Sequence, residues 1–303
     1  MITLITYGDP KYRTSIKLNK WTAKHIGKAD KVLSFTREDI DQDFFRENEK
    51  ILNSEPGGGY WLWKPYFVKK TLETIKEGDY LIYVDAGLYF VRSLDGIISH
   101  MQKTGKDVFL SGSLLPNGHW CKQVAFKAMG CDCEEAKKVT QCEGGFIAIR
   151  KSATSVRFVD EWLAYGCDYS LISDCSDEES SRQEAGFREH RNDQAILTNL
   201  AFLHGIRQNK GVAARSEYRY YSGLRGKNFY GYTRDELKKL AVEESSKDYF
   251  KECDYKRIVV NTRIDTNNPL LFTLRLVKKT AEAAWVDTAG VMIEKKLYKH
   301  EKP

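Results

Sequence analysis

Apolar residues along the first two hundred positions fall into two alternating patterns. Short, β-rich apolar runs predict strands at residues 2–6, 31–35, 80–84, 108–111 and 146–149. Between them, apolar positions spaced three or four apart predict helices at residues 15–26, 44–52, 63–75, 94–103, 124–129, 152–165 and 193–203. The run at 80–84 is apolar throughout, which is typical of a central strand buried on both faces.

This alternation of strands and helices predicts an α/β fold. It is typical of a Rossmann-like, mostly parallel central sheet with helices on both faces. We assign that domain to residues 1–232 and a mainly helical C-terminal extension to residues 233–303, where the alternation weakens. Thr233 opens the segment TRDE, which predicts a capped helix start. The Ser- and acid-rich stretch 173–184 predicts a mobile surface loop.

Composition narrows the class of protein. Shares of 42% apolar and 12% aromatic residues suit a packed core and exclude wholesale disorder. The 48 basic and 42 acidic residues leave a net charge of only +6, with both signs interspersed, so we do not expect a dedicated nucleic-acid binder. No apolar stretch approaches the roughly 18 to 20 residues that span a bilayer, and the first residues resemble a strand rather than a secretion signal.

The cysteines indicate a cellular compartment. The seven cysteines are an odd, irregularly spaced set, which predicts reduced thiols in a cytoplasmic protein. Cys131, Cys133 and Cys142 lack the usual spacing of a zinc site, so structural zinc is the less favoured interpretation.

Ligands of open α/β sheets bind beyond the carboxyl ends of the strands. That rule selects Thr6-Tyr7-Gly8 and Asp85-Ala86-Gly87, which follow or end the strands at 2–6 and 80–84. A carboxylate directly after a five-residue apolar strand is partly desolvated, so its charge requires a partner. A divalent cation on a diphosphate, a ribose hydroxyl or a buried arginine would serve. A turn-capping role for Asp85 is the alternative.

The segment GGGYWLWKP, residues 57–65, is the second feature. Its glycines permit positive φ angles and close backbone approach. Tyr60, Trp61 and Trp63 offer flat faces for a base or a sugar ring, and Lys64 offers a cation for a departing diphosphate. A glycine hinge followed by aromatic core residues explains much of the same pattern. It explains Lys64 least, because the helix dipole disfavours a cation at a helix start.

Two further segments carry polar groups. In EHRNDQAIL, residues 189–197, His190, Arg191 and Asp193 gather a titratable ring, an anion clamp and a carboxylate at one helix start. Asn192 or Asp193 as an ordinary helix cap is the alternative. In CEGGFIAIR, residues 142–150, Glu143 precedes two glycines and a strand, where an acceptor could approach the backbone or where an ordinary turn could lie.

Together these segments resemble the GT-A superfamily of glycosyltransferases, in particular small bacterial enzymes of capsule and O-antigen assembly. The motifs ITYGD, GGGYWLWKP, YLIYVDAGLYF, EGGFIAIR and EHRNDQAIL carry the resemblance, in that order. They span residues 5–197, about two thirds of the chain.

The resemblance implies a donor site. In that superfamily the strand ending at Asp85 carries an Asp-x-Asp motif that holds Mn²⁺ or Mg²⁺ on the donor diphosphate. Here the second carboxylate is missing, so one carboxylate with phosphate oxygens and water would hold the metal, or Lys64, Arg191 or another cation would replace it. Thr6 and Tyr7 match the usual nucleoside contacts, with Gly8 and Trp63 beside them.

The resemblance also implies an acceptor side and a base. Gly144 and Gly145 match the acceptor-side turn, and His190 and Arg191 are further acceptor contacts. Asp193 matches the position where inverting members place the base and where retaining members place an Asp that contacts acceptor or donor. We expect inversion with Asp193 as the base, and Glu143 is the second choice. The expected reaction moves a hexose, by analogy galactose in pyranose or furanose form, from a UDP-sugar to the hydroxyl of a glycan or lipid-linked glycan in surface polysaccharide synthesis.

Two rival functions remain open. A nucleotide-sugar pyrophosphorylase would carry a Gly-rich loop with an Arg-Lys pair after its first strand, where this chain has Tyr7-Gly8-Asp9-Pro10. A non-enzymatic glycan- or nucleic-acid-binding module could use the basic, Tyr-rich segment 215–232. Leu271, Leu274, Val277 and Ala281 recur at helical spacing between basic residues, which suits either a helix packed on its own domain or peripheral contact with an anionic membrane.

Overall fold

The computed structural model describes residues 1–213, 231–233, 235–237, 239–240, 243, 252–261 and 266–285. The chain forms two compact units, each built from several segments. The first contains Met1–Gly8, Asp30–Asp85 and Gly105–Gln208; the second contains Asp9–Ala29, Ala86–Thr104 and the described residues from Asn209 on. Both units are therefore discontinuous in sequence, whereas the sequence predicted a single boundary after residue 232. The basic, Tyr-rich segment at 215–232 lies almost wholly outside the described residues.

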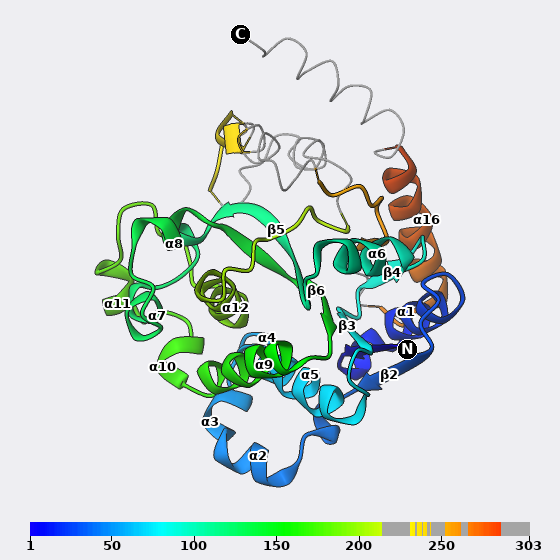
Figure 1. Cartoon of the computed structure of the whole chain (residues 1–303), viewed down its shortest axis with the longest axis horizontal. Coiled ribbons are helices and arrows are strands. Elements are labelled where there is room, and N and C mark those ends of the chain that lie inside the picture. The colour runs from blue at the N-terminus through cyan, green and yellow to red at the C-terminus, as the bar shows by residue number, and fades with distance from the viewer. Residues whose placement is uncertain are drawn as a thin grey trace. The chain divides into compact units, whose positions relative to one another are not determined.

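A five-stranded sheet organises the first unit and confirms the α/β fold (Figure 1). Its order is β2 (Lys31–Phe35), β1 (Ile2–Tyr7), β3 (Tyr80–Val84), β6 (Thr140–Arg150) and β5 (Val108–Pro116). β1 runs parallel to β2 and β3, whereas β6 runs antiparallel to β3 and β5. The sheet is thus mixed and only partly parallel. β6 is the next strand after β5 in sequence, and it pairs directly with β5 as an antiparallel neighbour. The sequence pattern located both strands but did not reveal their relative direction.

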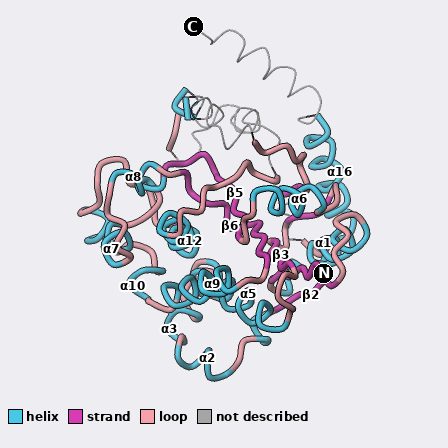
Figure 2. The backbone as a smooth tube through the Cα atoms, viewed as in Figure 1, coloured by secondary structure: helices cyan, strands magenta, loops and turns pink. Residues whose placement is uncertain are grey.

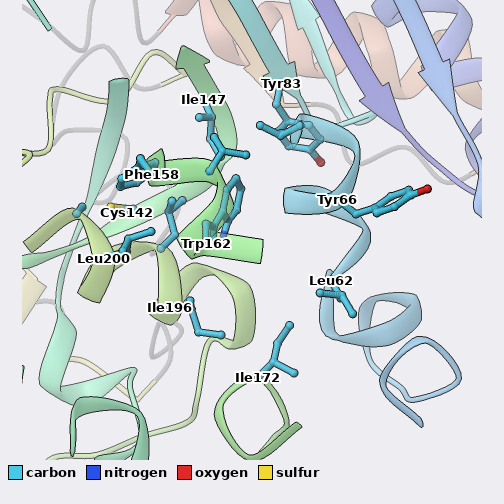
Figure 3. Close-up of a cluster of buried hydrophobic side chains, with 14 of the residues drawn as sticks. Leu62, Tyr66, Tyr83, Cys142, Ile147, Phe158, Trp162, Ile172, Ile196 and Leu200 are labelled. Carbon is cyan, nitrogen blue, oxygen red and sulfur yellow. The ribbon is translucent and has the colours of Figure 1, made fainter. Parts of the chain in front are cut away.

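One face of this sheet carries the main core. Helices α5 (Trp63–Thr74), α9 (Ala153–Gly166) and α12 (Asn192–Leu203) pack there, as the tube view also shows (Figure 2). Every second strand residue faces this core: Tyr83 and Ile147 from the sheet lie in one cluster with Trp162 and Leu200 from the helices (Figure 3). All five residues of β3 are buried, as its uninterrupted apolar run predicted.

Shorter helices complete the first unit. They are η2 (Arg37–Asp39), α2 (Gln42–Glu47), α3 (Glu49–Leu52), α4 (Gly57–Tyr60), η3 (Asn117–His119), α7 (Gln123–Ala128), α8 (Glu134–Lys138), α10 (Tyr169–Ile172) and α11 (Asp177–Ser181). The predicted helix at 44–52 is two helices. The predicted loop at 173–184 contains α11, because Ser176 and Glu179 form a capping box.

The second unit contains η1 (Pro10–Tyr12), α1 (Arg13–His25), β4 (Leu88–Phe90), α6 (Asp95–Thr104), β7 (Val259–Asn261) and α16 (Pro269–Trp285). β4 pairs antiparallel with β7. Thr233 and Glu236 exchange the side-chain to backbone hydrogen bonds of a capping box, which confirms the helix start predicted there. No disulfide joins any of the seven cysteines, all of which lie in the described residues. Within the described residues, no helix has the length and apolar character needed to cross a bilayer.

Candidate active site

A left-handed turn leads into the site. Gly57, Gly58, Gly59, Tyr60 and Trp61 all have positive φ angles, between 50° and 99°. Glycine adopts this region freely, but Tyr60 and Trp61 do so at a cost. Hydrogen bonds from Gly59 N to Ser54 O and from Tyr60 N to Pro56 O, at 2.8 and 2.9 Å, close the turn. The turn reverses the hand of the backbone immediately before α5 and so fixes how Trp63 and Lys64 enter the core.

Trp63 and Tyr7 form a stacked pair. Their ring centroids lie 3.8 Å apart with an interplanar angle of 16°, and both rings are buried. The indole Nε1 of Trp63 donates to Gly57 O at 2.9 Å, which ties the pair to the left-handed turn. Each ring therefore covers a face of the other. The sequence left open whether Trp63 is a core residue or offers its ring to a ligand. In the structure Trp63 packs in the core against Tyr7.

The remaining residues at the strand ends lie in different settings. Thr6 is fully buried, and Gly8 N donates to Phe35 O at 3.2 Å. Asp85 is partly exposed at the carboxyl end of β3, and its backbone N–H donates to Gly145 O at 2.9 Å. Ala86 and Gly87 form the turn before β4. The predicted donor residues of the first unit thus include a partly exposed Asp85 after β3 and a buried, stacked Tyr7 at the end of the neighbouring strand β1.

Lys64 and Asp193 form a buried ion pair. Their Nζ and Oδ2 atoms lie 2.7 Å apart, and each side chain is only 5% exposed, although the residues are 129 positions apart in sequence. The Lys64 ammonium also lies 5.4 and 5.9 Å from the ring centroids of Tyr83 and Trp63. Burial raises the pKa of the Asp193 carboxyl, the Lys64 charge lowers it, and the Asp85 charge raises it again, with a net rise.

Tyr83 holds Asp85, one of the two acids of the candidate site. Its hydroxyl donates to Asp85 Oδ1 at 2.6 Å. Burial raises the pKa of the Tyr83 phenol well above its usual range, and the charges of Asp85 and Asp193 add to that rise. The phenol therefore stays protonated and holds one oxygen of Asp85. Sequence reasoning missed Tyr83, yet strand alternation places residues two apart on one face, so Tyr83 and Asp85 could have been paired from sequence.

Gly144 borders the ion pair from β6. A Cβ atom at Gly144 would lie 3.0 Å from Lys64 Nζ and 3.7 Å from Asp193 Oδ2. The backbone N–H of Gly144 donates to Gln194 Oε1 at 3.4 Å. The ladder between β5 and β6 shifts register between the pairs Leu110–Ile147 and Ser111–Glu143. Gly144 and Gly145 lie in that bulge, a device that often re-aims a strand beside a site.

His190 and Arg191 lie next to Asp193 in sequence but face other partners. His190 is buried; its Nδ1 accepts from Lys122 N at 3.2 Å and its Nε2 donates to Leu171 O at 2.7 Å. Burial, and then the Lys122 charge, lower the pKa of His190 to about 3. Both ring nitrogens are engaged within the protein, which gives His190 a structural role. Arg191 is paired with Glu189 at 2.9 Å and lies over the Trp120 ring at 4.6 Å.

The donor set does not fit a protein-built metal site. Among the described residues, no three Asp, Glu, His or Cys side chains gather where they could hold a metal ion. One oxygen of Asp85 accepts from Tyr83, and Asp193 is paired with an ammonium that would repel a cation. If a donor-bound Mn²⁺ or Mg²⁺ were held here, Asp85 would be its single carboxylate ligand among these residues, and phosphate and water oxygens would have to supply the rest.

Comparison with known proteins identifies similar structures but no sequence relatives. No family model and no curated protein matches the sequence. The chain is similar in structure to mouse xyloside xylosyltransferase 1 in its apo form, with 9% identity, a TM-score of 0.45, and coverage of 88% of this chain and 99% of that one.

Two other glycosyltransferases are similar. Galactosyltransferase LgtC, in complex with donor and acceptor sugar analogues, has 12% identity and a TM-score of 0.42, covering 92% of this chain and 96% of that one. The bifunctional glycosyltransferase WbbM has 8% identity and a TM-score of 0.43, covering 88% of this chain and 46% of that one. These TM-scores lie below 0.5, so the likeness carries no inference about the activity of this chain.

Proposed function

We propose that this chain is a glycosyltransferase that moves a hexose from a nucleotide diphosphate sugar to a glycan hydroxyl. The observation that carries the proposal is the group formed by Lys64, Asp193, Tyr83 and Asp85 at the carboxyl end of β3. Ligands of open α/β sheets bind at that edge. The order of the sequence motifs, which resembles GT-A enzymes, supports the same reaction class.

Asp193 is the proposed base. Its buried carboxyl has a raised pKa, which brings it closer to the range in which a carboxylate removes protons effectively. In the proposed transfer, the acceptor oxygen bonds to the anomeric carbon while its proton passes to Asp193. The bond from that carbon to the donor phosphate breaks with its electron pair, which leaves a nucleoside diphosphate. This route inverts the anomeric centre.

Lys64 is the proposed cation for the departing diphosphate. Among the described residues, its ammonium has a single hydrogen-bond acceptor, Asp193 Oδ2, so two N–H groups are left for phosphate oxygens. A buried ammonium needs such acceptors, because burying unmatched donors is costly. As Asp193 gains the acceptor proton, Lys64 loses its carboxylate partner and pairs with the newly formed diphosphate charge.

The finer assignments are part of the same proposal. UDP-galactose, in pyranose or furanose form, is the proposed donor, and Asp85 faces its diphosphate with or without a metal ion. Gly144 and Gly145 border the proposed acceptor, and Glu143 is the second choice of base. The proposed acceptor is a glycan or lipid-linked glycan of bacterial surface polysaccharide.

Calorimetry and an assay of UDP release test this function. Wild type is expected to bind UDP and to release UDP from UDP-galactose in the presence of acceptor. Asp193→Asn should keep UDP binding within about threefold and lower turnover by at least about 100-fold. Asp85→Asn should weaken UDP binding itself. Asp160→Asn is the matched control, because Asp160 pairs with Lys69 on the surface.

Each outcome has a defined meaning. Full turnover in Asp193→Asn would exclude Asp193 as the base. Binding of another nucleoside diphosphate instead of UDP would change the donor only. No binding of any nucleoside diphosphate, with or without Mn²⁺, would end the proposal.

We also propose that α16 contacts an anionic membrane. Leu270, Leu274 and Val277 follow one face of α16 and are 71%, 61% and 63% exposed, whereas Phe272 on another face is buried. Arg275 and Lys278 beside this stripe are exposed and basic, which complements an anionic surface. That choice of partner also suits a lipid-linked acceptor.

Vesicle flotation tests the membrane contact. Phosphatidylglycerol vesicles should carry the protein upward, and neutral phosphatidylcholine vesicles should not. Leu274→Ser should weaken binding about tenfold, because one exposed leucine no longer enters the interface. Val124→Ser, at an exposed apolar position of α7, should bind as wild type does. Equal binding by both variants would exclude α16 as the contact.

A further inference from the structure

Asn192 occupies an unfavourable backbone conformation immediately before the proposed base. Its φ angle is +45°, in the left-handed region that a non-glycine residue rarely adopts. The residue is only 4% exposed and forms the first position of α12, with Asp193 next in the chain. Strained conformations of this kind persist only where surrounding contacts fix them, and they cluster at functional sites.

Contacts of the Asn192 side chain fix that conformation. Its Nδ2 donates to Ile172 O at 2.8 Å and to Asp174 Oδ1 at 2.9 Å. Neither bond caps α12, and Arg191 is the residue at its N-cap, without a side-chain capping bond. The capping role that the sequence suggested for Asn192 is therefore replaced by an anchor to the segment that follows α10.

The two residues before Asn192 are anchored as well. His190 accepts from Lys122 N through one ring nitrogen and donates to Leu171 O through the other. The backbone N–H of Arg191 donates to Trp120 O at 3.0 Å. Three consecutive residues are thus held from outside α12, which fixes the direction in which that helix begins.

We infer that Asn192 is a positioning residue, which holds the Asp193 carboxylate against Lys64 through its anchored left-handed backbone. This inference rests on the proposed function for its catalytic consequence. Asn192 touches no reacting group in that scheme; it acts through the residue that follows it. A return of φ to the ordinary helical region would rotate the start of α12 and move Asp193 away from a contact that is only 2.7 Å long.

A double-mutant cycle in two backgrounds tests the inference. K64M, D193N and the double variant are made with Asn192 present and again with N192A, which removes both side-chain anchors and, unlike glycine, disfavours a positive φ. The folding equilibrium constant of each protein is measured by denaturation. With Asn192, the coupling between Lys64 and Asp193 should exceed about tenfold. With N192A, it should fall below about threefold. A purely structural role would weaken all four proteins equally and leave the coupling unchanged.

Turnover gives a second measurement that does not depend on removing either charge. N192A should lower kcat for UDP release from UDP-galactose about tenfold while KM stays within about twofold, because a small misplacement of a catalytic group is costly. K28A is the matched control, because Lys28 also has a left-handed φ, of +60°, but is exposed and lies in the second unit. It should leave both the coupling and kcat unchanged.

The outcomes separate the two proposals. Unchanged coupling in N192A overturns the positioning role, whatever the activity. A wild type that neither binds UDP nor releases it fails the proposed function, while the coupling still decides whether Asn192 holds Asp193. Reduced coupling together with a reduced kcat supports both.

Discussion

Two buried lysines in the first unit use their charges in opposite ways. Lys64 is paired with a carboxylate, lies near two aromatic rings, and has one hydrogen-bond acceptor among the described residues. Lys122 is fully buried and donates to the carbonyl and hydroxyl oxygens of Ser173, at 2.7 and 3.3 Å. Within the described residues it has no ion-pair partner, and burial lowers its pKa.

The difference separates the proposed site, which contains Lys64, from the surrounding fold, which contains Lys122. The acceptors of Lys122 belong to the fold, so its hydrogen bonds tie α7 to the end of α10. Lys64 has two N–H groups without an acceptor among the described residues, and its partner is a titratable carboxylate. The two lysine environments meet at the start of α12, where His190 is held by the fold and Asp193 belongs to the proposed site. Burial of a charge alone therefore does not select a candidate site; unused bonding capacity is the observation that favours Lys64.

The largest expected effect is the loss of one partner of the ion pair. Lys64→Met should reduce the free energy of unfolding by about 3–5 kcal/mol, because it leaves Asp193 buried without a counter-charge. Adding Asp193→Asn should recover most of that loss, since no buried charge then remains. Urea denaturation of the single and double variants measures both. A single variant as stable as wild type would show that the pair is not buried as described.

The buried His190 beside Lys122 should instead make the free energy of unfolding depend on pH. Its pKa falls from 6.5 to about 3 in the folded protein, so the unfolded chain binds the extra proton between those values. The contribution of His190 to the free energy of unfolding is therefore fully present above about pH 6.5 and decreases as the pH falls toward 3. From pH 7 to pH 4 the loss is about 3 kcal/mol. His190→Gln should abolish that share of the slope, as denaturation at several pH values would reveal.

The smallest effect is expected at the second lysine. Lys122→Met removes two hydrogen bonds but also removes a charge that burial penalises, so the unfolding free energy should change by no more than about 2 kcal/mol. UDP binding and turnover should match wild type. A loss as large as that of Lys64→Met would remove the distinction between the two lysines.

Sequence patterns predicted isolated elements better than their arrangement. The strands at 31–35 and 80–84 match β2 and β3, because short β-rich runs between turn residues have few alternatives and the second run is apolar throughout. The strand predicted at 146–149 extends from Thr140, since its first residues are polar or small and carry no period-two signal across the bulge at Gly144. The antiparallel course of β6 depends on which strand it joins, and local pattern does not encode that choice.

The candidate site shows the same division. Lys64, Asp85 and Asp193 were each selected from sequence by residue type beside an element end. Their grouping depends on packing between segments more than one hundred residues apart, so no spacing rule could pair Lys64 with Asp193. The anchor at Asn192 was hidden for another reason, because a left-handed φ at a non-glycine residue is imposed by tertiary contacts rather than by propensity.

The left-handed turn at Gly57–Trp61 limits how this chain can vary. An L-residue with a Cβ atom at Gly59 would meet Leu52 Cα at 2.7 Å, in addition to the cost of its φ of +99°. At Gly58 an added Cβ atom would meet nothing within 4 Å, so only the cost of its φ of +62° opposes a side chain there. Five consecutive residues thus have the left-handed backbone that L-residues normally avoid. Relatives that keep the stacking of Trp63 on Tyr7 are therefore expected to have glycine at position 59, even where the surrounding sequence differs.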